Sequence, residues 1–485
     1  MRESDVRYTG RQKHERIQLI NIHEQLIKEK KMTSFHVDFN NKIGKIKPMH
    51  GVGNAPLLGC NNMLFHYLGE AGIPYSRLHD TGGNYGGGCF VDIANIFRDF
   101  NADPADPDSY DFAFTDWLIA ELEKQNVQPF YRLGASIECE HYIRAYNIYP
   151  PADFQKWAEI CAGIIRHYNE GWADGFHYGI QYWEIWNEPD NEPDIRDNPM
   201  WKGTKEEFFR LYEITSNALK SQFPHLKIGG YASCGFYAIS DSAFSANANS
   251  SHRVEYFLEF FHDFLKYITS PEHKSPLDFF SWHSYMTIEK NISYAQYARE
   301  VLDAYGFTKT ENILNEWNMG PNLRGTIEDA SYISGMLCAM QNTPIDKMMY
   351  YDAQVHANYG GLFDPIHRTV FKSYYAFAAF NELYLLQNQA ACTVPDEKDI
   401  IPLAAISEEG EAAAILVTNM NPVPVQVVCT LAPASGRRIA GITCLATDTS
   451  HAFTETKTFQ FDAAQHRLIC DLPEHSFYLF RVRMK

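Results

Sequence analysis

The sequence predicts an α/β fold, a (β/α)8 TIM barrel with a C-terminal antiparallel β-sandwich domain. Short apolar runs recur along residues 44–353, and patterns of helical period lie between several of them. After residue 385 the helical period gives way to closely spaced strand-like runs. Strands that alternate with helices are typical of a parallel sheet with crossover helices. Eight such units within about 310 residues fit a closed barrel better than an open sheet.

The predicted barrel strands follow one another along the chain. They span residues 44–51, 74–80, 127–134, 179–189, 226–233, 277–285, 311–318 and 346–353. Apolar residues recur every three or four positions in the predicted helices, which span residues 112–125, 154–169, 206–222 and 294–306. An open doubly wound sheet would require a GxGxxG turn between its first strand and helix, and the sequence has none there.

The two ends of the chain differ from the barrel. Residues 386–485 contain strand patterns separated by turns and predict the β-sandwich domain. In the N-terminal segment, 1–41, residues 33–41 have a strand pattern and are a candidate to join that sheet. Residues 11–31 predict a basic, partly amphipathic helix that packs in solvent rather than a polybasic binding helix. The barrel is then assigned to residues 42–385.

Composition and charge exclude some classes of partner. The net charge is −18, and no cluster of Lys and Arg predicts contact with nucleic acid or an anionic membrane. The N-terminus is charged and lacks an apolar signal region, and no apolar run is long enough to span a bilayer. The ten cysteines form no CxxC pair and suit reduced, buried thiols. We expect a cytoplasmic protein, although a removed signal peptide would leave the same N-terminus.

Two carboxylates are predicted at the C-terminal ends of barrel strands, where barrels carry catalytic residues. Glu188 ends the fourth strand in YWEIWNEP, and Glu316 ends the seventh strand in ILNEWN. These strands face each other across the barrel mouth. Cleavage of a glycosidic bond needs one acid for the leaving oxygen and a second carboxylate for the oxocarbenium-like charge, about 5–5.5 Å away in retaining enzymes. The acid should have a raised pKa, and its partner should stay ionised.

These two motifs resemble clan A of the glycoside hydrolases. The chain as a whole is most similar to family 39, the β-xylosidase and α-L-iduronidase family, which joins a barrel to a β-sandwich. The Glu-Trp-Asn that follows Asn315 also resembles the nucleophile motif of family 51 arabinofuranosidases. The resemblance implies a retaining, double-displacement mechanism with Glu188 as acid/base and Glu316 as nucleophile. It also implies that Asn187 forms a hydrogen bond with the substrate 2-hydroxyl.

Strands two and six supply further candidates. His283 and Tyr285 end the sixth strand in SWHSY, with side chains on the same face. The family resemblance implies that the Tyr285 hydroxyl orients Glu316. It also implies that Arg77, inside the second strand, pairs with the nucleophile and keeps it ionised. The alternative for Tyr285 is a barrel-lining tyrosine with an ordinary partner.

Contacts to the sugar are expected at the rim of the barrel. His79 and Asp80 follow the second strand and are positioned to bind hydroxyl groups, although residues of these types near turns are as often structural. Trp317 is a candidate to stack on a sugar ring or simply to pack. The end of strand eight and the loop beyond it supply candidates to line nearby subsites or serve structure alone, namely Asp352, Gln354, His356, Asn358 and Tyr359.

Some carboxylate and glycine signals are interpreted as structural. Glu184 is expected to be a hydrogen-bonded barrel carboxylate, and Glu192, in a second Asn-Glu-Pro, is expected to lie in a loop. The glycine-rich segment 81–89 lacks the Lys-Ser/Thr of a phosphate-binding loop and is interpreted as a lip over the site. The histidines show no HExxH and no ligand cluster, so we expect no metal and no cofactor.

The sequence therefore predicts an exo-acting, β-xylosidase-like glycoside hydrolase that acts on a glycoside or oligosaccharide. Alternatives within the class are an α-L-arabinofuranosidase, a β-glucosidase or mannosidase, and an endo-glycanase, because substrate choice depends on loops. A non-catalytic carbohydrate-binding protein would be favoured by loss of either carboxylate, and both are present. A metal-dependent barrel hydrolase would need ligands at several strand ends. Assembly into a homo-oligomer is left open.

Overall fold

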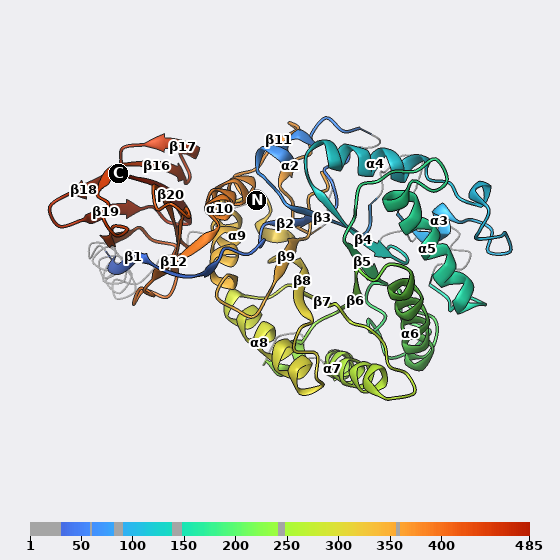
Figure 1. Cartoon of the computed structure of the whole chain (residues 1–485). Helices are drawn as coiled ribbons and strands as arrows, with labels where there is room; N and C mark the ends of the chain where they lie inside the picture. Colours follow the sequence, from blue (N-terminus) through green and yellow to red (C-terminus); the bar gives the residue numbers. More distant parts are fainter. Residues whose placement is uncertain (1–30, 59–60, 82–90, 138–147, 241–247, 356–358) are drawn as a thin grey trace, which may run out of the picture.

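The computed structural model describes residues 31–58, 61–81, 91–137, 148–240, 248–355 and 359–485, with residues 248–251 and 321 described by their backbone alone (Figure 1). Four features predicted from the sequence lie outside these ranges wholly or in large part, namely the helix over 11–31, the glycine-rich segment 81–89, His356 and Asn358.

Eight parallel strands close a barrel in chain order, and the last strand pairs with the first. They are β2 (Gly51–Gly53), β3 (Tyr75–Leu78), β4 (Gln128–Leu133), β5 (Tyr182–Ile185), β6 (Lys227–Ser233), β7 (Phe279–Ser284), β8 (Glu311–Trp317) and β9 (Lys347–Tyr350). The predicted fold class is confirmed. The first strand differs from its predicted range because Gly44 and Lys45 pair with a strand of the second sheet, so the barrel strand begins at Gly51.

Helices surround the barrel on the outside (Figure 1). They are α2 (His66–Glu70), α3 (Ile93–Ile96), α4 (Ala113–Lys124), α5 (Phe154–Glu170), α6 (Lys205–Gln222), α7 (Ala248–Thr269), α8 (Ile288–Ala304), α9 (Ile327–Met340) and α10 (Tyr374–Leu386). Short one-turn helices and one hairpin complete the barrel segment, namely η1 (Pro107–Ser109), η2 (Tyr237–Ile239), η3 (Pro321–Leu323), β10 (Phe363–Asp364) and β11 (Thr369–Val370). No helix in the described ranges has the length and apolar character needed to cross a membrane.

Local signals in the sequence set the helix ends. The Asp153 side chain accepts a hydrogen bond from the backbone of Lys156 at the start of α5, and Gly171 ends the helix in a left-handed conformation with φ 76°. At the start of α6, Thr204 and Glu207 form a reciprocal capping box. The observed α5 and α6 therefore begin and end within one residue of the predicted ranges.

The interior of the barrel is layered from apolar to polar along the strand direction. Inward side chains near the N-terminal ends form a small apolar cluster, with Phe130, Tyr182, Phe279, Ile313 and Met349. Two residues further along their strands the inward positions are polar, at Arg132, Glu184, Ser281 and Asn315. Because every second side chain of a strand faces inward, these polar residues lie in the layer above the apolar cluster. The interior of the barrel is therefore polar towards the C-terminal ends of the strands.

The second sheet contains ten strands, drawn in orange and red apart from the N-terminal β1 (Figure 1). They are β1 (Lys31–Lys45), β12 (Asn388–Cys392), β13 (Ile400–Ile406), β14 (Ala412–Asn419), β15 (Val425–Ala432), β16 (Ile439–Thr447), β17 (Ala452–Thr456), β18 (Phe459–Asp462), β19 (Arg467–Leu472) and β20 (Ser476–Met484). The strand order is β17-β16-β20-β14-β13-β12-β1-β15-β19-β18. Neighbouring strands are antiparallel except β1 and β15, which are parallel over Lys31–Asp38 and Val425–Ala432.

The sheet buries both of its faces, and β14 shows how. Ile415 belongs to a core enclosed by the sheet itself, and Phe459 near one edge contacts Phe480 of β20 with ring centroids 5.8 Å apart. Leu416, the next residue, belongs to the core that the sheet shares with the barrel helices. Ser334 of α9 and Thr418 of β14 place their hydroxyl oxygens 2.6 Å apart across this contact. The division of the chain at residues 41/42 and 385/386 stays a prediction.

Candidate active site

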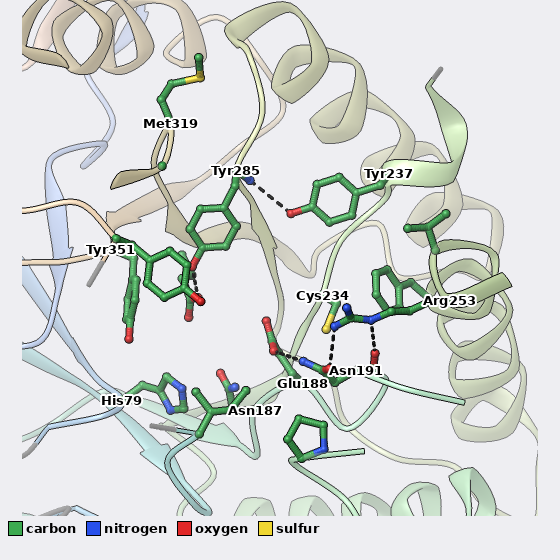
Figure 2. Close-up of a pocket in the computed structure, with 17 residues that line it drawn as sticks. His79, Asn187, Glu188, Asn191, Cys234, Tyr237, Arg253, Tyr285, Met319 and Tyr351 are labelled. Atoms are coloured by element: carbon green, nitrogen blue, oxygen red, sulfur yellow. Dashed lines mark hydrogen bonds between the residues drawn. The ribbon is translucent and has the colours of Figure 1, made fainter. Parts of the chain in front are cut away.

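A cavity of about 580 Å³ opens at the C-terminal ends of the barrel strands (Figure 2). Ligand sites of small molecules are clefts of a few hundred to a thousand Å³, and barrel enzymes carry theirs at this end. The residues that line it are His79, Ile137, Asn187, Glu188, Asn191, Pro199, Cys234, Tyr237, Arg253, Val254, Phe257, Tyr285, Glu316, Met319, Gly320, Tyr351 and Tyr359.

Glu188 lies just beyond the end of β5, in a turn rather than in the strand itself. Trp186 and Glu188 both have positive φ values, 75° and 45°, which non-glycine residues rarely adopt. The backbone N–H of Glu188 donates to the carbonyl oxygen of Ala232 at 3.0 Å and anchors the turn to the end of β6. This backbone geometry holds the Glu188 carboxylate at the cavity wall. Strained backbone of this kind is frequent at functional sites.

Both oxygens of the Glu188 carboxylate have close partners. Oε1 lies 2.7 Å from Nδ1 of His283, and Oε2 accepts a hydrogen bond from the side-chain amide of Asn191 at 2.7 Å. Asn191 is itself held by Arg253, which donates to its backbone oxygen and to its side-chain oxygen, each at 2.7 Å. Because Arg253 takes the amide oxygen, the amide nitrogen of Asn191 is directed at Glu188.

Glu316 is also held by three side chains. The Tyr285 hydroxyl donates to Oε1, and Nη1 of Arg77 donates to Oε2 at 3.1 Å. His283 reaches the same Oε2 from the other side, with Nε2 at 3.6 Å. The arrangement predicted for Tyr285 and Arg77, with both directed at Glu316, is present in the structure.

The Glu188 and Glu316 carboxylates lie close to each other at the cavity. One oxygen of Glu188, one oxygen of Glu316 and one nitrogen of His283 all lie within 4.8 Å of one another. Retaining enzymes place the two carboxyl groups about 5–5.5 Å apart, and inverting enzymes leave about 6.5–9.5 Å for a water. Oxygens this close are compatible with the retaining arrangement, in which one carboxylate attacks directly.

The pKa of Glu188 is shifted in the opposite direction to the one expected for the catalytic acid. Burial favours a raised pKa for Glu188, but the hydrogen bond and charge of His283 outweigh burial, so the pKa of Glu188 is lowered. Burial also favours a lowered pKa for His283, yet the charge of Glu316 and the bond to Glu188 raise it above its usual value. The two groups therefore titrate as a pair, because each alters the pKa of the other. The expected raised pKa of an isolated acid is not found.

A buried polar layer supports the site from below. Arg77 donates from Nε to Glu184 at 2.8 Å and from Nη2 to Asn187 at 2.6 Å, besides its bond to Glu316. Glu184 also accepts from Ser281 and Asn315, so its role is structural, as expected. Since Arg77 holds the amide oxygen of Asn187, the amide nitrogen is directed away from it, and Asn187 lines the cavity.

His79 and Asp80 lie at the opposite wall, close to Tyr351. His79 lines the cavity, and burial together with the charges of Arg77 and Arg132 holds its pKa well below the usual value. Its Nδ1 accepts a bond from Arg132 at 3.2 Å, so the neutral ring carries its proton on Nε2. Asp80 accepts from the Tyr351 hydroxyl at 3.0 Å and from the backbone of Ile137 at 2.7 Å.

Asp352 lies behind Tyr351, at the end of β9. Burial, followed by the charges of Asp80 and Glu316, raises its pKa to about 8. It accepts hydrogen bonds from the side chain of Asn54 at 2.9 Å and of Gln354 at 3.3 Å. Neither Asp352 nor Gln354 is among the cavity-lining residues, whereas Tyr359 is.

Four of the candidate substrate-site residues predicted from the sequence do not line the cavity, namely Trp317, His283, Arg77 and Asp80. Trp317 is fully buried against Tyr332 and Tyr350, because it follows Glu316 on the strand and so points outward to the helices. It is therefore not available to stack on a sugar. His283 and Arg77 are each 1% exposed, and their polar atoms face the carboxylates. Their geometry suits positioning of the carboxylates rather than contact with the substrate.

Other lining residues were not singled out from the sequence. Asn191 lies two residues beyond the Asn-Glu-Pro motif of Glu188 and begins the second Asn-Glu-Pro, and this short spacing from Glu188 is the local signal for it. Cys234 and Tyr237 come from the loop after β6, and Arg253 comes from α7. No motif marks these three, because they approach Glu188 through packing of residues that are distant from it in the sequence.

The cluster of Glu188, His283 and Glu316 is a group of three potential metal ligands among the described residues. Both oxygens of Glu188 are already taken by close contacts, one with Nδ1 of His283 and one with the Asn191 amide. The Arg77 cation also occupies Glu316. The bonding and charge of the cluster suit a proton-sharing group better than a cation site.

Comparison with known proteins also indicates a glycoside hydrolase. The family model of glycosyl hydrolases family 39 matches residues 67–348, more than half of the chain. A β-xylosidase of Geobacillus stearothermophilus is 30% identical over 212 residues, which cover 41% of this chain and 35% of that protein. A β-xylosidase of Caldicellulosiruptor saccharolyticus is 22% identical over 403 residues, which cover 74% of this chain and 72% of that protein.

Solved structures share the fold at low sequence identity. A glucosidase from Croceicoccus marinus superposes with a TM-score of 0.73 at 20% identity, covering 93% of this chain and 99% of that one. A family 39 β-xylosidase from Caulobacter crescentus gives a TM-score of 0.60 at 15% identity, with the same coverage. The match extends over both the barrel and the second sheet.

Proposed function

Because this chain belongs to glycosyl hydrolase family 39 of clan A, we propose that it hydrolyses glycosidic bonds with retention of configuration, as an exo-acting β-xylosidase. The observation that carries the proposal is the pair of carboxylates, Glu188 and Glu316, within 4.8 Å at the carboxyl ends of β5 and β8. The two relatives described as β-xylosidases support the choice of sugar. The first of these relatives is matched over about a third of its length. The specificity for xylose is therefore part of the proposal.

In the proposed first step, a carboxylate oxygen of Glu316 attacks the anomeric carbon and the bond to the leaving oxygen breaks. Glu188 gives its proton to that oxygen, and the sugar becomes an ester of Glu316. In the second step, Glu188 takes a proton from water, the water oxygen attacks the anomeric carbon, and Glu316 leaves as a carboxylate. No metal ion or cofactor is needed for either step.

The surrounding side chains have proposed roles that follow from their contacts. Tyr285 and Arg77 hold the Glu316 carboxylate in a fixed orientation through their hydrogen bonds to its two oxygens. His283 retains the proton that Glu188 delivers, through the 2.7 Å contact between Nδ1 and Oε1. Asn187 presents its amide nitrogen to the cavity, where it donates to the 2-hydroxyl of the sugar.

His79, Asp80 and Tyr351 supply the proposed hydroxyl contacts on the far wall of the cavity. His79 and Tyr351 line it directly, while Asp80 fixes the Tyr351 hydroxyl.

We assign the protein to a reducing compartment, such as the cytoplasm. Seven described cysteines are free, and six of them are buried, which suits thiols kept reduced.

Hydrolysis of a panel of 4-nitrophenyl glycosides tests the proposal, with Glu316→Ala as the control. We expect wild type to release 4-nitrophenol fastest from the β-xyloside. The variant should lose at least about a thousandfold in kcat, because it lacks the attacking group. Near-normal turnover by a folded Glu316→Ala protein would refute the mechanism, and preference for another sugar would refute the β-xylosidase assignment alone.

A further inference from the structure

The cavity is divided by Glu188 into two halves of different character. His79, Asn187 and Tyr351 lie on one side of Glu188, and Cys234, Tyr237 and Arg253 lie on the other (Figure 2). Cys234 and Tyr237 line the same cavity as Glu188. The first half contains the polar groups proposed to hold the sugar.

The leaving group must occupy the second half if Glu188 is the acid. The nucleophile attacks the anomeric carbon from one side, and the acid protonates the departing oxygen on the other. The aglycone then extends from that oxygen past Glu188, towards Cys234, Tyr237, Val254 and Phe257. This assignment of the two halves rests on the function proposed above.

The described wall of the second half is apolar. Val254 and Phe257 of α7 and Cys234 border the cavity and are each no more than 5% exposed. Tyr237 packs its ring edge-on against Phe257 with centroids 6.4 Å apart, and its hydroxyl oxygen accepts a bond from the backbone of Tyr285 at 3.2 Å. Pro199 adds a further apolar ring.

The guanidinium of Arg253, in this half of the cavity, is already bound to protein groups. Arg253 donates from Nε and Nη2 to Asn191, and its Nε lies 3.0 Å from a carboxylate oxygen of Glu192. Its guanidinium also lies over the Phe257 ring, 5.7 Å from the centroid. Through these contacts Arg253 orients Asn191, which in turn orients Glu188. Arg253 therefore serves this purpose rather than binding a sugar hydroxyl.

A second sugar would be poorly matched to such a wall. Each hydroxyl that loses water there without gaining a partner costs free energy, whereas an apolar group gains from burial against Val254 and Phe257. We propose that the preferred substrates are glycosides of aromatic or other apolar alcohols, rather than oligosaccharides of xylose. Val254 and Phe257 are the residues that determine this specificity.

A comparison of two substrates with the same sugar tests the proposal. The substrates are 2-phenylethyl β-D-xyloside and xylobiose, with β-D-xylosyl fluoride as a reference whose leaving group needs no aglycone site. The sugar hydroxyl of xylobiose is a better leaving group than 2-phenylethanol, so a preference for the phenylethyl compound must come from binding. We expect kcat/KM for the phenylethyl xyloside to exceed that for xylobiose by about tenfold or more.

The outcomes separate this inference from the proposed function. Equal or faster cleavage of xylobiose would overturn the aglycone assignment while leaving the β-xylosidase proposal standing. Failure to cleave all three xylosides would overturn both.

A matched pair of variants assigns the preference to the wall. Val254→Thr replaces one methyl group by a hydroxyl of similar shape in the cavity, and Val301→Thr makes the same change in α8, away from the cavity. We expect Val254→Thr to lower the ratio of kcat/KM for the phenylethyl xyloside to that for the fluoride by about fivefold. Val301→Thr should leave the ratio unchanged. The same ratio in both variants would refute the role of Val254.

Discussion

His283 connects the two proposed catalytic carboxylates at the scale of single residues. Its Nδ1 lies 2.7 Å from Glu188, its Nε2 lies 3.6 Å from Glu316, and the ring is 1% exposed. The negative charges raise the pKa of His283 above 6.5, while His283 lowers the pKa of Glu188. The proton needed by the leaving group is therefore held by the pair rather than by Glu188 alone.

This sharing predicts an altered pH profile for His283→Gln. As pH rises through the raised pKa of His283, the pair of His283 and Glu188 loses the proton that the leaving group needs. In wild type, kcat/KM should therefore fall on the basic side at a pH above 6.5. In the variant Glu188 must hold the proton alone, and we expect the basic limb to move down by about one pH unit. Rates measured from pH 4 to 9 on the best 4-nitrophenyl glycoside check this.

His262→Gln is the matched control for that profile. His262 bonds to Tyr297 and Tyr305, away from the cavity, and its replacement should leave both limbs in place. An unshifted basic limb in His283→Gln would mean that the imidazole does not share the proton.

Residue-level prediction from the sequence reaches those candidates whose chemistry is local, and their roles stay predictions. Glu188 and Glu316 stand in short motifs at strand ends, and their convergence follows from the barrel. Arg253 has no such signal, because its contact with Asn191 joins residues 62 positions apart in the sequence. For Trp317 the sequence leaves stacking on a sugar and simple packing open, and the structure shows packing, because alternation along β8 turns Trp317 outward once Glu316 faces inward.

At the scale of elements, α9 begins with a carboxyl that is buried instead of exposed. Thr326 caps the helix by accepting a bond from the backbone of Asp329 at 3.1 Å. Burial raises the pKa of the Asp329 carboxyl to about 7, in spite of the favourable helix terminus. One of its oxygens has no hydrogen-bond partner among the described residues. Asp329 is therefore neutral in the folded protein at slightly acidic pH.

Asp329→Asn should change how stability depends on pH. The folded protein holds this proton up to about pH 7 and the unfolded chain releases it near 3.8, so wild type loses stability as pH rises between these values. Asparagine does not titrate. The variant should therefore gain about 2–3 kcal/mol on wild type between pH 5 and pH 8, measured from urea midpoints.

The neighbouring carboxylate provides the control for that measurement. Glu328 lies in the same first turn of α9 but is exposed. Glu328→Gln should track wild type at both pH values. A pH-independent difference between Asp329→Asn and wild type would show that the carboxyl is already ionised when folded.

The elements themselves were predictable where period and capping agreed. The ranges of α5 and α6 follow from apolar spacing and from Asp153 and Thr204 at their starts. The strand of Glu188 was predicted to run through residue 189, but β5 ends at Ile185. The positive φ of Trp186 breaks the extended backbone, and no residue type there signals this.

At the scale of the whole molecule, the second sheet shares a core with the barrel. Leu403, Leu416 and Leu479 pack in the same cluster as the apolar side chains of α9 and α10. Ion pairs join the same surfaces, such as Arg481 with Glu382 at 2.7 Å. A shared core predicts that sheet and barrel unfold together rather than as separate units.

Two adjacent residues of β14 test that cooperativity. Leu416→Ala removes side-chain volume from the shared core, and Ile415→Ala removes it from the core inside the sheet; both are fully buried. We expect each to cost about 2–5 kcal/mol and to lower a single thermal transition seen alike by circular dichroism and tryptophan fluorescence. Two separated transitions in Ile415→Ala would show that the sheet unfolds independently.

The overall pairing of strands was only partly accessible from the sequence. Eight alternating units determine the parallel order of the barrel, since crossover helices leave few other arrangements. The position of β1 between β12 and β15 joins segments nearly 400 residues apart. Its parallel alignment with β15 has no local signature, because register there depends on which faces the rest of the sheet buries.

The most direct test of the central claim is covalent labelling of the nucleophile. A 2,4-dinitrophenyl 2-deoxy-2-fluoro-β-D-xyloside has a leaving group that departs without acid, and its fluorine slows release of the glycosyl-enzyme. We expect inactivation with the mass of one fluoroxylosyl group added to the protein, on the peptide that contains Glu316. Labelling of a different residue, or turnover that releases the inverted sugar without labelling, would contradict the account.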